Sequence, residues 1–304
     1  MMDFTAFYGC LIPNRYPGIE ASIRKVMPLL DVNIHDLPEF SCCPAPGVFQ
    51  SFDYDTWLAL AARNIAVAEA AGRDVLTFCN GCFGSLSEAN KVIQEDELKR
   101  EKVNRALAKV GMEVKGTINV KHIAILLYKD VGLDAIAQKV TRPLNLRVAT
   151  HSGCHLLRSD EYREIDDSER PIVFDKLVQA IGCDPVEYNA KTQCCGAGGG
   201  VRSAVLDVSL QVLHNKLRVL GEIPDVDCIT DLCPFCHLQL DRGQVELQRT
   251  YGLEYATPVL YYLQLLGMAM GLSPDELGVT LNFTPVEPLL KKLNITVGAP
   301  DIGI

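Results

Sequence analysis

Cysteine is the residue type in this sequence that could do chemistry, because ten of its twelve cysteines form two sets with the same order. Each set has a single cysteine, then two adjacent cysteines, then a C-x-x-C pair. Corresponding cysteines lie 144, 152 and 154 residues apart, and their flanks agree, as in CCPAPG and CCGAGG. The repetition indicates an internal duplication of about 150 residues. The first set is Cys10, Cys42, Cys43, Cys79 and Cys82, and the second is Cys154, Cys194, Cys195, Cys233 and Cys236.

Five thiols in each set restrict the chemistry. Disulfide pairing would leave one cysteine over in each set, and the members of a Cys-Cys pair are poorly placed to bond to each other. Zinc takes four ligands, and cubane iron–sulfur clusters take four thiolates, usually from a compact run that this sequence lacks. The pattern therefore favours a soft site of several irons held by more than four thiolates. Zinc at one set and metal-free thiol redox chemistry remain as alternatives.

Strands that alternate with helices are expected to position these cysteines. This order predicts an α/β fold of two similar, duplicated halves with parallel sheets. Each cysteine group follows an expected strand, so it lies at the carboxyl end of a sheet, where open α/β folds bind ligands. We expect a first cysteine-rich domain in residues 1–145 and a second, with C-terminal helices and a tail, in 146–304. The expected strands are 4–8, 32–35, 74–78, 146–150 and 227–231, and the expected helices are 19–30, 54–71, 95–110, 171–181 and 201–220, with further helical turns in 119–140.

The composition predicts a globular protein without nucleic-acid or membrane partners. The chain has 304 residues, of which 48% are hydrophobic, and a formal net charge of −9, which disfavours binding to nucleic acid and anionic membranes. Its most apolar stretch, 258–272, is shorter than the roughly 20 residues of a membrane span, so we expect a buried helix there. Without a signal-peptide pattern we expect a cytoplasmic protein with reduced thiols. Cys183 and Cys228, which belong to neither set, are expected to be small buried residues.

The repeated pattern C-x(31–39)-C-C-x(35–39)-C-x-x-C resembles the cysteine-rich CCG-domain family, which includes the B subunits of the methanogen CoB–CoM heterodisulfide reductases. The CCG triplet itself stands at Cys194-Cys195-Gly196, whereas the first copy has Pro44 in the third position. The resemblance extends to about Leu293. It implies two non-cubane 4Fe-4S clusters, each held by the five cysteines of one set.

The resemblance also implies an activity and partners. The activity is the two-electron reduction of the disulfide CoM-S-S-CoB to the thiols of coenzyme M and coenzyme B. Electrons would come through the C subunits of these reductases, which carry cubane iron–sulfur clusters, and through the A subunits, which carry flavin. A hydrogenase or formate dehydrogenase can join the larger complex. The alternative is a related CCG-domain redox subunit that acts on fumarate or succinate, lactate or glycolate, sulfur compounds or a quinone. A structural zinc protein is a third hypothesis.

Several residues outside the two sets are candidates for catalysis and substrate binding. His155 follows Cys154, and an imidazole that titrates near neutral pH can give protons to product thiolates. His151 and His237 are expected to pack around the cysteines. The sulfonate, carboxylate and phosphate of the implied substrate need local cations on an acidic protein, and the candidates are Arg15, Lys129, Arg158 and Arg202.

Overall fold

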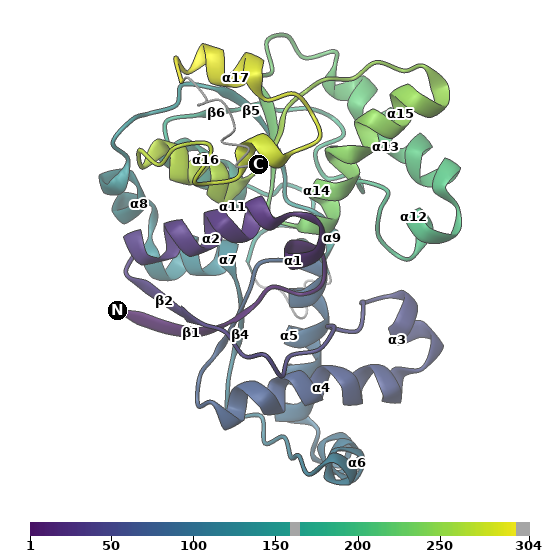
Figure 1. Cartoon of the computed structure of the whole chain (residues 1–304). Helices are drawn as coiled ribbons and strands as arrows, with labels where there is room; N and C mark the ends of the chain where they lie inside the picture. Colours follow the sequence, from purple (N-terminus) through teal and green to yellow (C-terminus); the bar gives the residue numbers. More distant parts are fainter. Residues whose placement is uncertain (159–164, 296–304) are drawn as a thin grey trace, which may run out of the picture.

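The computed structural model describes residues 1–158 and 165–295. Its framework is two four-stranded sheets, and the strands within each sheet are parallel (Figure 1). The first sheet has the order β2-β1-β3-β4 and the second β6-β5-β7-β8, so both halves share one topology. The prediction of two duplicated α/β halves with parallel sheets is confirmed. The strands are β1 (Met2–Phe7), β2 (Val32–His35), β3 (Val75–Thr77), β4 (Val120–His122), β5 (Arg147–His151), β6 (Asp184–Pro185), β7 (Cys228–Asp231) and β8 (Val259–Tyr261).

The helices of the first half begin where the sequence offers caps. The Asp53 carboxylate accepts a hydrogen bond from the Thr56 backbone N–H at 3.0 Å and caps α4, and Asp96 caps α6 in the same way. A proline in the first turn of α2 suits its start. The helices up to the second sheet are α1 (Leu11–Arg15), α2 (Pro17–Leu29), α3 (Val48–Phe52), α4 (Tyr54–Ala70), α5 (Asn80–Glu95), α6 (Glu97–Leu107), η1 (Ala108–Val110), α7 (Ile123–Ile125), η2 (Leu126–Val131) and α8 (Leu133–Lys139).

The helices of the second half follow the same plan. Helix α13 corresponds to α4, and α14 corresponds to α5, because each occupies the same place relative to the matching cysteines. Helix α13 buries Leu210, Leu213 and Leu217, which lie on one helical face. The described helices are α9 (Cys154–Leu157), α11 (Val173–Ala180), α12 (Val201–Ala204), α13 (Leu206–Leu220), α14 (Pro234–Leu240), α15 (Arg242–Tyr251), α16 (Tyr262–Ala269), η3 (Val279–Leu281) and α17 (Glu287–Lys292).

Three expected elements were wrong in part. The apolar stretch 258–272 begins with strand β8 and continues as helix α16, because a short apolar run suits a buried strand as well as a buried helix. For the same reason the stretch 119–140 contains strand β4 before its helical turns. The expected helix 201–220 is interrupted at Val205, whose φ of −142° is not helical. No helix among the described residues is both long and apolar enough to cross a membrane.

The two halves are joined by a shared hydrophobic core and by helices that begin at the cysteines. Helix α2 of the first half packs against α16 of the second, and one hydrophobic core contains Ile19 and Ile23 together with Leu263 and Leu266. Helix α5 also packs on α9, and α1 on α14 (Figure 1). Helices α1, α5, α9 and α14 each begin at or next to a cysteine of the two sets. The fold therefore brings the two sets of cysteines to the junction between the halves.

Candidate metal centre

Both C-x-x-C pairs lie at the point where a strand turns into a helix. Cys79 is the N-cap of α5, after β3, and Cys82 is in the first turn of that helix. Cys233 is the N-cap of α14, after β7, and Cys236 is in its first turn. The positive end of a helix dipole stabilises a thiolate, so both pairs are placed to act as anionic sulfur ligands.

The two sets meet at these C-x-x-C pairs. The Sγ atoms of Cys79 and Cys233 are 3.8 Å apart, and those of Cys195 and Cys236 are 3.5 Å apart. All twelve cysteines are free thiols. The thiols of the two sets interact in one continuous series, which runs in the order Cys10, Cys42, Cys43, Cys82, Cys79, Cys233, Cys236, Cys195, Cys194 and Cys154.

Crowding of the thiols shifts their pKa values in opposite directions. Contact with the thiols of Cys154 and Cys195 lowers the pKa of Cys194 to about 2, while contact with Cys194 raises the pKa of Cys195 to about 12. Neighbouring thiols share protons in this way because adjacent thiolates repel each other. Bound cations remove that repulsion. Each set offers five sulfur atoms that form no disulfide and that come from one half of the chain. Five thiolates fit a soft centre of several irons better than a zinc site, which takes four ligands.

The first set is open to solvent on one side. Cys10 and Cys42 are exposed, and both line a pocket of about 320 Å³ together with Gly9, Asp36 and Phe40. Cys43, in contrast, is buried in the same half. A small molecule can therefore reach the outer cysteines of the first set.

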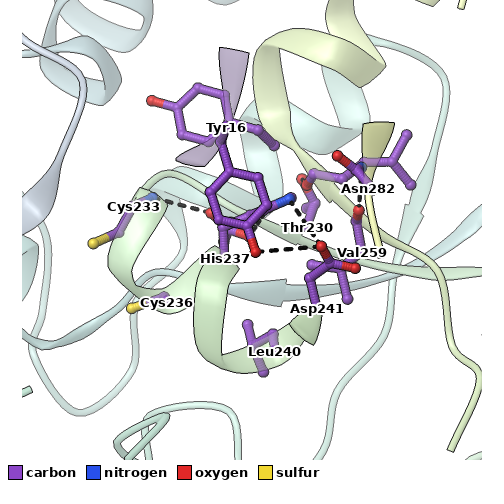
Figure 2. A network of polar contacts seen from close by, with 12 residues as sticks. Tyr16, Thr230, Cys233, Cys236, His237, Leu240, Asp241, Val259 and Asn282 are labelled. Atoms are coloured by element: carbon purple, nitrogen blue, oxygen red, sulfur yellow. Dashed lines mark hydrogen bonds and ion pairs between the residues drawn. The ribbon is translucent and has the colours of Figure 1, made fainter. Parts of the chain in front are cut away.

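A buried polar network holds the second C-x-x-C pair (Figure 2). The Asp231 carboxylate accepts a hydrogen bond from the Cys233 backbone N–H at 3.1 Å and lies 2.9 Å from Nδ1 of His237. Burial disfavours the charged imidazole, but the carboxylates of Asp231 and Asp241 outweigh this effect and raise the pKa of His237. His237 is completely buried and directly follows Cys236.

Asp241 extends this network into the first half. Its carboxylate accepts hydrogen bonds from the Thr284 backbone N–H and Oγ1, each at 2.7 Å, and from the Phe283 N–H at 2.9 Å. The Tyr16 hydroxyl donates to the same carboxylate at 3.4 Å (Figure 2). The Tyr16 ring stands edge-on to the ring of His237. Sequence reasoning missed Asp231, which directly precedes the second cysteine loop, and no local pattern marks Tyr16 as a distant member of the same network.

The predicted histidines lie at the second set. His155 is half-buried on α9, directly after Cys154. His151 ends β5 and is completely buried, and burial lowers the pKa of its ring to about 3. One ring nitrogen of His151 and the sulfurs of Cys195 and Cys236 all lie within 4.8 Å of one another.

The four basic side chains that are predicted to bind the substrate lie on separate elements. Arg202 on α12 is largely buried and pairs with Glu246 at 2.6 Å, so its charge is already compensated. Arg158, after α9, pairs with a surface glutamate at 3.2 Å. Arg15 at the end of α1 and Lys129 in η2 are exposed. The role of all four residues in substrate binding stays a prediction. Arg15 ends the short helix α1, which begins directly after the exposed Cys10.

Comparison with known proteins agrees with the duplicated cysteine pattern. Residues 4–87 and 148–241 match the family described as CCG, cysteine-rich domain. The chain is 48% identical to a protein of Methanosarcina mazei, one of the B subunits of the ferredoxin:CoB-CoM heterodisulfide reductases, over 98% of this chain and 99% of that protein. It is 30% identical to "8-methylmenaquinol:fumarate reductase membrane anchor subunit" of Wolinella succinogenes, over 92% of this chain and 96% of that protein.

A solved structure supports the fold. The crystal structure of a hypothetical protein from Helicobacter pylori matches with a TM-score of 0.74 at 15% identity, over 93% of this chain and 52% of the other.

The chain therefore belongs to the family of heterodisulfide reductase B subunits and related CCG-domain proteins, which are iron–sulfur redox subunits of multisubunit oxidoreductases.

Proposed function

We propose that this protein is the catalytic subunit that reduces CoM-S-S-CoB, with one non-cubane 4Fe-4S cluster held by each set of five cysteines. The observation that carries the proposal is the 3.8 Å contact between the sulfurs of Cys79 and Cys233. It makes the two metal sites neighbours, so that one small disulfide can touch both. The same placement supports a division into two domains, residues 1–145 and 146–304, with the reaction at their junction.

The reaction adds two electrons and two protons to one S–S bond and yields two thiols. When bound, the two clusters supply the electrons. The chain itself holds the clusters through its cysteines, and the pocket beside Cys10 and Cys42 admits the substrate. His155, half-buried beside Cys154, is the proposed proton donor from an imidazole nitrogen. Arg15, Lys129, Arg158 and Arg202 are the proposed contacts for the anionic groups, with Arg15 favoured by its exposure and its place after Cys10.

The proposed partners belong to the C subunits of these reductases, with cubane clusters, and to the A subunits, with flavin. The sequence contains neither a flavin fingerprint nor a ferredoxin-type cysteine run, so the electrons must enter from another chain. We propose that the complex is cytoplasmic and that a hydrogenase or formate dehydrogenase can supply it.

A second candidate is a related redox subunit with another substrate. The likeness to a subunit of a menaquinol:fumarate reductase supports it, because 30% identity extends over nearly the whole of both chains. In that case the same two sites would exchange electrons with a quinone or another protein of the complex, and the heterodisulfide would not be turned over.

The test uses protein prepared without oxygen. Iron and acid-labile sulfide analysis should give about eight irons per chain, and coenzyme M should produce a new paramagnetic species in the oxidised protein. Replacement of the ligand in Cys43→Ser should lower the iron content, whereas the buried, unrelated Cys228→Ser should keep it. Turnover of CoM-S-S-CoB with a chemical reductant, compared with fumarate and a quinone, decides between the two candidates. Iron near zero in the unchanged protein would refute both.

A further inference from the structure

The two metal sites differ at one buried position beside each. In the first sheet, β1 ends at Phe7, which pairs with Thr77 on β3. In the second sheet, β5 ends at His151, which pairs with Asp231 on β7. Phe7 and His151 therefore hold corresponding places, each three residues before the single cysteine of its set. The first site has an apolar ring where the second has an imidazole.

Among the described residues, the imidazole of His151 has no hydrogen-bond partner that would explain its burial. Its exposed fraction is 1%, and within the described residues neither Nδ1 nor Nε2 makes a hydrogen bond. The backbone of Lys191 lies close enough to favour the charged form of the ring, but the two groups form no hydrogen bond. Buried polar atoms in folded proteins normally have partners, so such a ring indicates a group that the polypeptide does not itself supply.

The position of the ring shows where that group would be. One of its nitrogens and the sulfurs of Cys195 and Cys236 lie within 4.8 Å of one another, and both cysteines belong to the second set. A neutral imidazole carries one N–H that can be donated. The N–H can donate a hydrogen bond to a sulfur atom of a cluster held by these cysteines.

We propose that His151 donates a hydrogen bond from a ring N–H to the second iron–sulfur cluster, a contact that the first site lacks. This inference rests on the proposed two-cluster function. It makes the two clusters chemically distinct although their cysteine ligands are equivalent. A hydrogen bond from a ring N–H to a cluster sulfur stabilises negative charge on the cluster, so it raises the reduction potential of the second cluster.

A second buried difference between the two halves also favours a higher reduction potential of the second cluster. Lys216 on α13 and Asn64 on α4 occupy corresponding places in the two halves. Lys216 donates hydrogen bonds to the carbonyls of Ala190, Lys191 and Gln193, and its charge is felt by four cysteines of the second set. The negative charge of Asp231, which lies beside Cys233, opposes this effect and is itself compensated by His237 at 2.9 Å.

The test is pulsed EPR on the whole protein, prepared without oxygen, with ¹⁴N- or ¹⁵N-labelled histidine. We expect a histidine nitrogen coupling on one cluster signal, which is lost in His151→Phe and kept in the control His214→Asn, a half-buried histidine whose Nδ1 lies 2.9 Å from the Tyr255 hydroxyl. Iron content should not fall in His151→Phe, because five cysteines remain and phenylalanine is the residue of the first site. Phe7→His should add a second coupling.

A redox titration adds a readout that a merely structural role would not move. In His151→Phe the equilibrium constant for one-electron reduction of the second cluster should fall at least tenfold, which is a shift of about 59 mV, while the other cluster keeps its potential. Full iron content without any histidine coupling in the unchanged protein would overturn the inference and leave the two-cluster proposal intact. Iron near zero would overturn both. A coupling that survives in His151→Phe would also overturn the assignment.

Discussion

The free energy of unfolding should depend on pH partly through His122, and one substitution should remove this part. His122 ends β4, is completely buried, and lies against the ring of Phe83 with 5.5 Å between centroids. Burial lowers its pKa to about 4, and the Cys233 thiol and the Leu232 backbone, which favour the charged ring, only partly oppose this. The unfolded chain, with an ordinary pKa of about 6.5, binds a proton more readily. Stability is therefore lost as the pH falls from about 6.5 toward 4.

The size of this loss follows from the two pKa values. At pH 7 both states carry a neutral ring and the contribution is close to zero. At pH 5 nearly all unfolded molecules have bound a proton, whereas the folded ring remains neutral, which lowers the free energy of unfolding by about 2 kcal/mol. Below pH 4 the loss reaches its limit of about 3 kcal/mol, because both states are then protonated.

The assay compares urea unfolding of the unchanged protein and His122→Asn between pH 7 and pH 5 under anaerobic conditions. Asparagine cannot titrate, and its side-chain oxygen can still accept the Ala124 N–H that Nδ1 of His122 accepts at 3.1 Å. The unchanged protein should lose about 2 kcal/mol more than the variant over this range. His122→Phe lacks the acceptor, so it should be less stable at every pH but show the same reduced slope. Equal slopes for the unchanged protein and both variants would refute the reasoning.

Two further substitutions test the junction between the halves. Tyr261→Phe removes a hydroxyl that donates to the Phe78 carbonyl at 2.8 Å, so the free energy of unfolding should fall by about 1–2 kcal/mol in urea titrations, and an unchanged midpoint would contradict the importance of this contact. Gly18→Ala would place a Cβ 2.4 Å from the Gly278 carbonyl oxygen and should destabilise by about 1–3 kcal/mol, whereas the control Gly198→Ala, which meets no atom within 4 Å, should stay within about 0.5 kcal/mol. Equal melting temperatures for the two alanine variants would argue against the close backbone contact.

Much of the fold could be predicted because the chain repeats its own pattern. A strand is expected before each C-x-x-C pair, and the structure has these strands at β3 and β7. The fourth strand of each sheet was not predicted as a strand. β4 and β8 have three residues each, and such short apolar segments carry no periodicity that separates a buried strand from a helix.

The chemistry of the site was only partly readable for a different reason. The ten cysteines are visible in sequence because their spacing repeats, whereas His151 has no counterpart of its own type in the first half. Its importance depends on a place in the sheet and on the absence of a hydrogen-bond partner among the described residues. Asp241 likewise meets Tyr16 across 225 positions of sequence, which no local pattern encodes.

Several contacts between the halves lie next to the cysteines of the C-x-x-C pairs. The residue that ends the last strand of each sheet reaches into the other half. Tyr261 donates to the carbonyl of Phe78, just before Cys79, and His122 lies by the backbone of Leu232, just before Cys233. Each half thus fixes the C-x-x-C loop of the other.

Asn80, in the first loop, adds a hydrogen bond of 2.6 Å to the carbonyl of Ser152, which precedes Cys154 by two residues. A shift of one half against the other would therefore displace ligands of both sets together. Because the spacing of the two sites is built from the same contacts that orient their sulfurs, a half expressed alone would lack support for its own C-x-x-C loop. The ten cysteines of the two sets therefore meet at one junction, which is held by contacts from both halves.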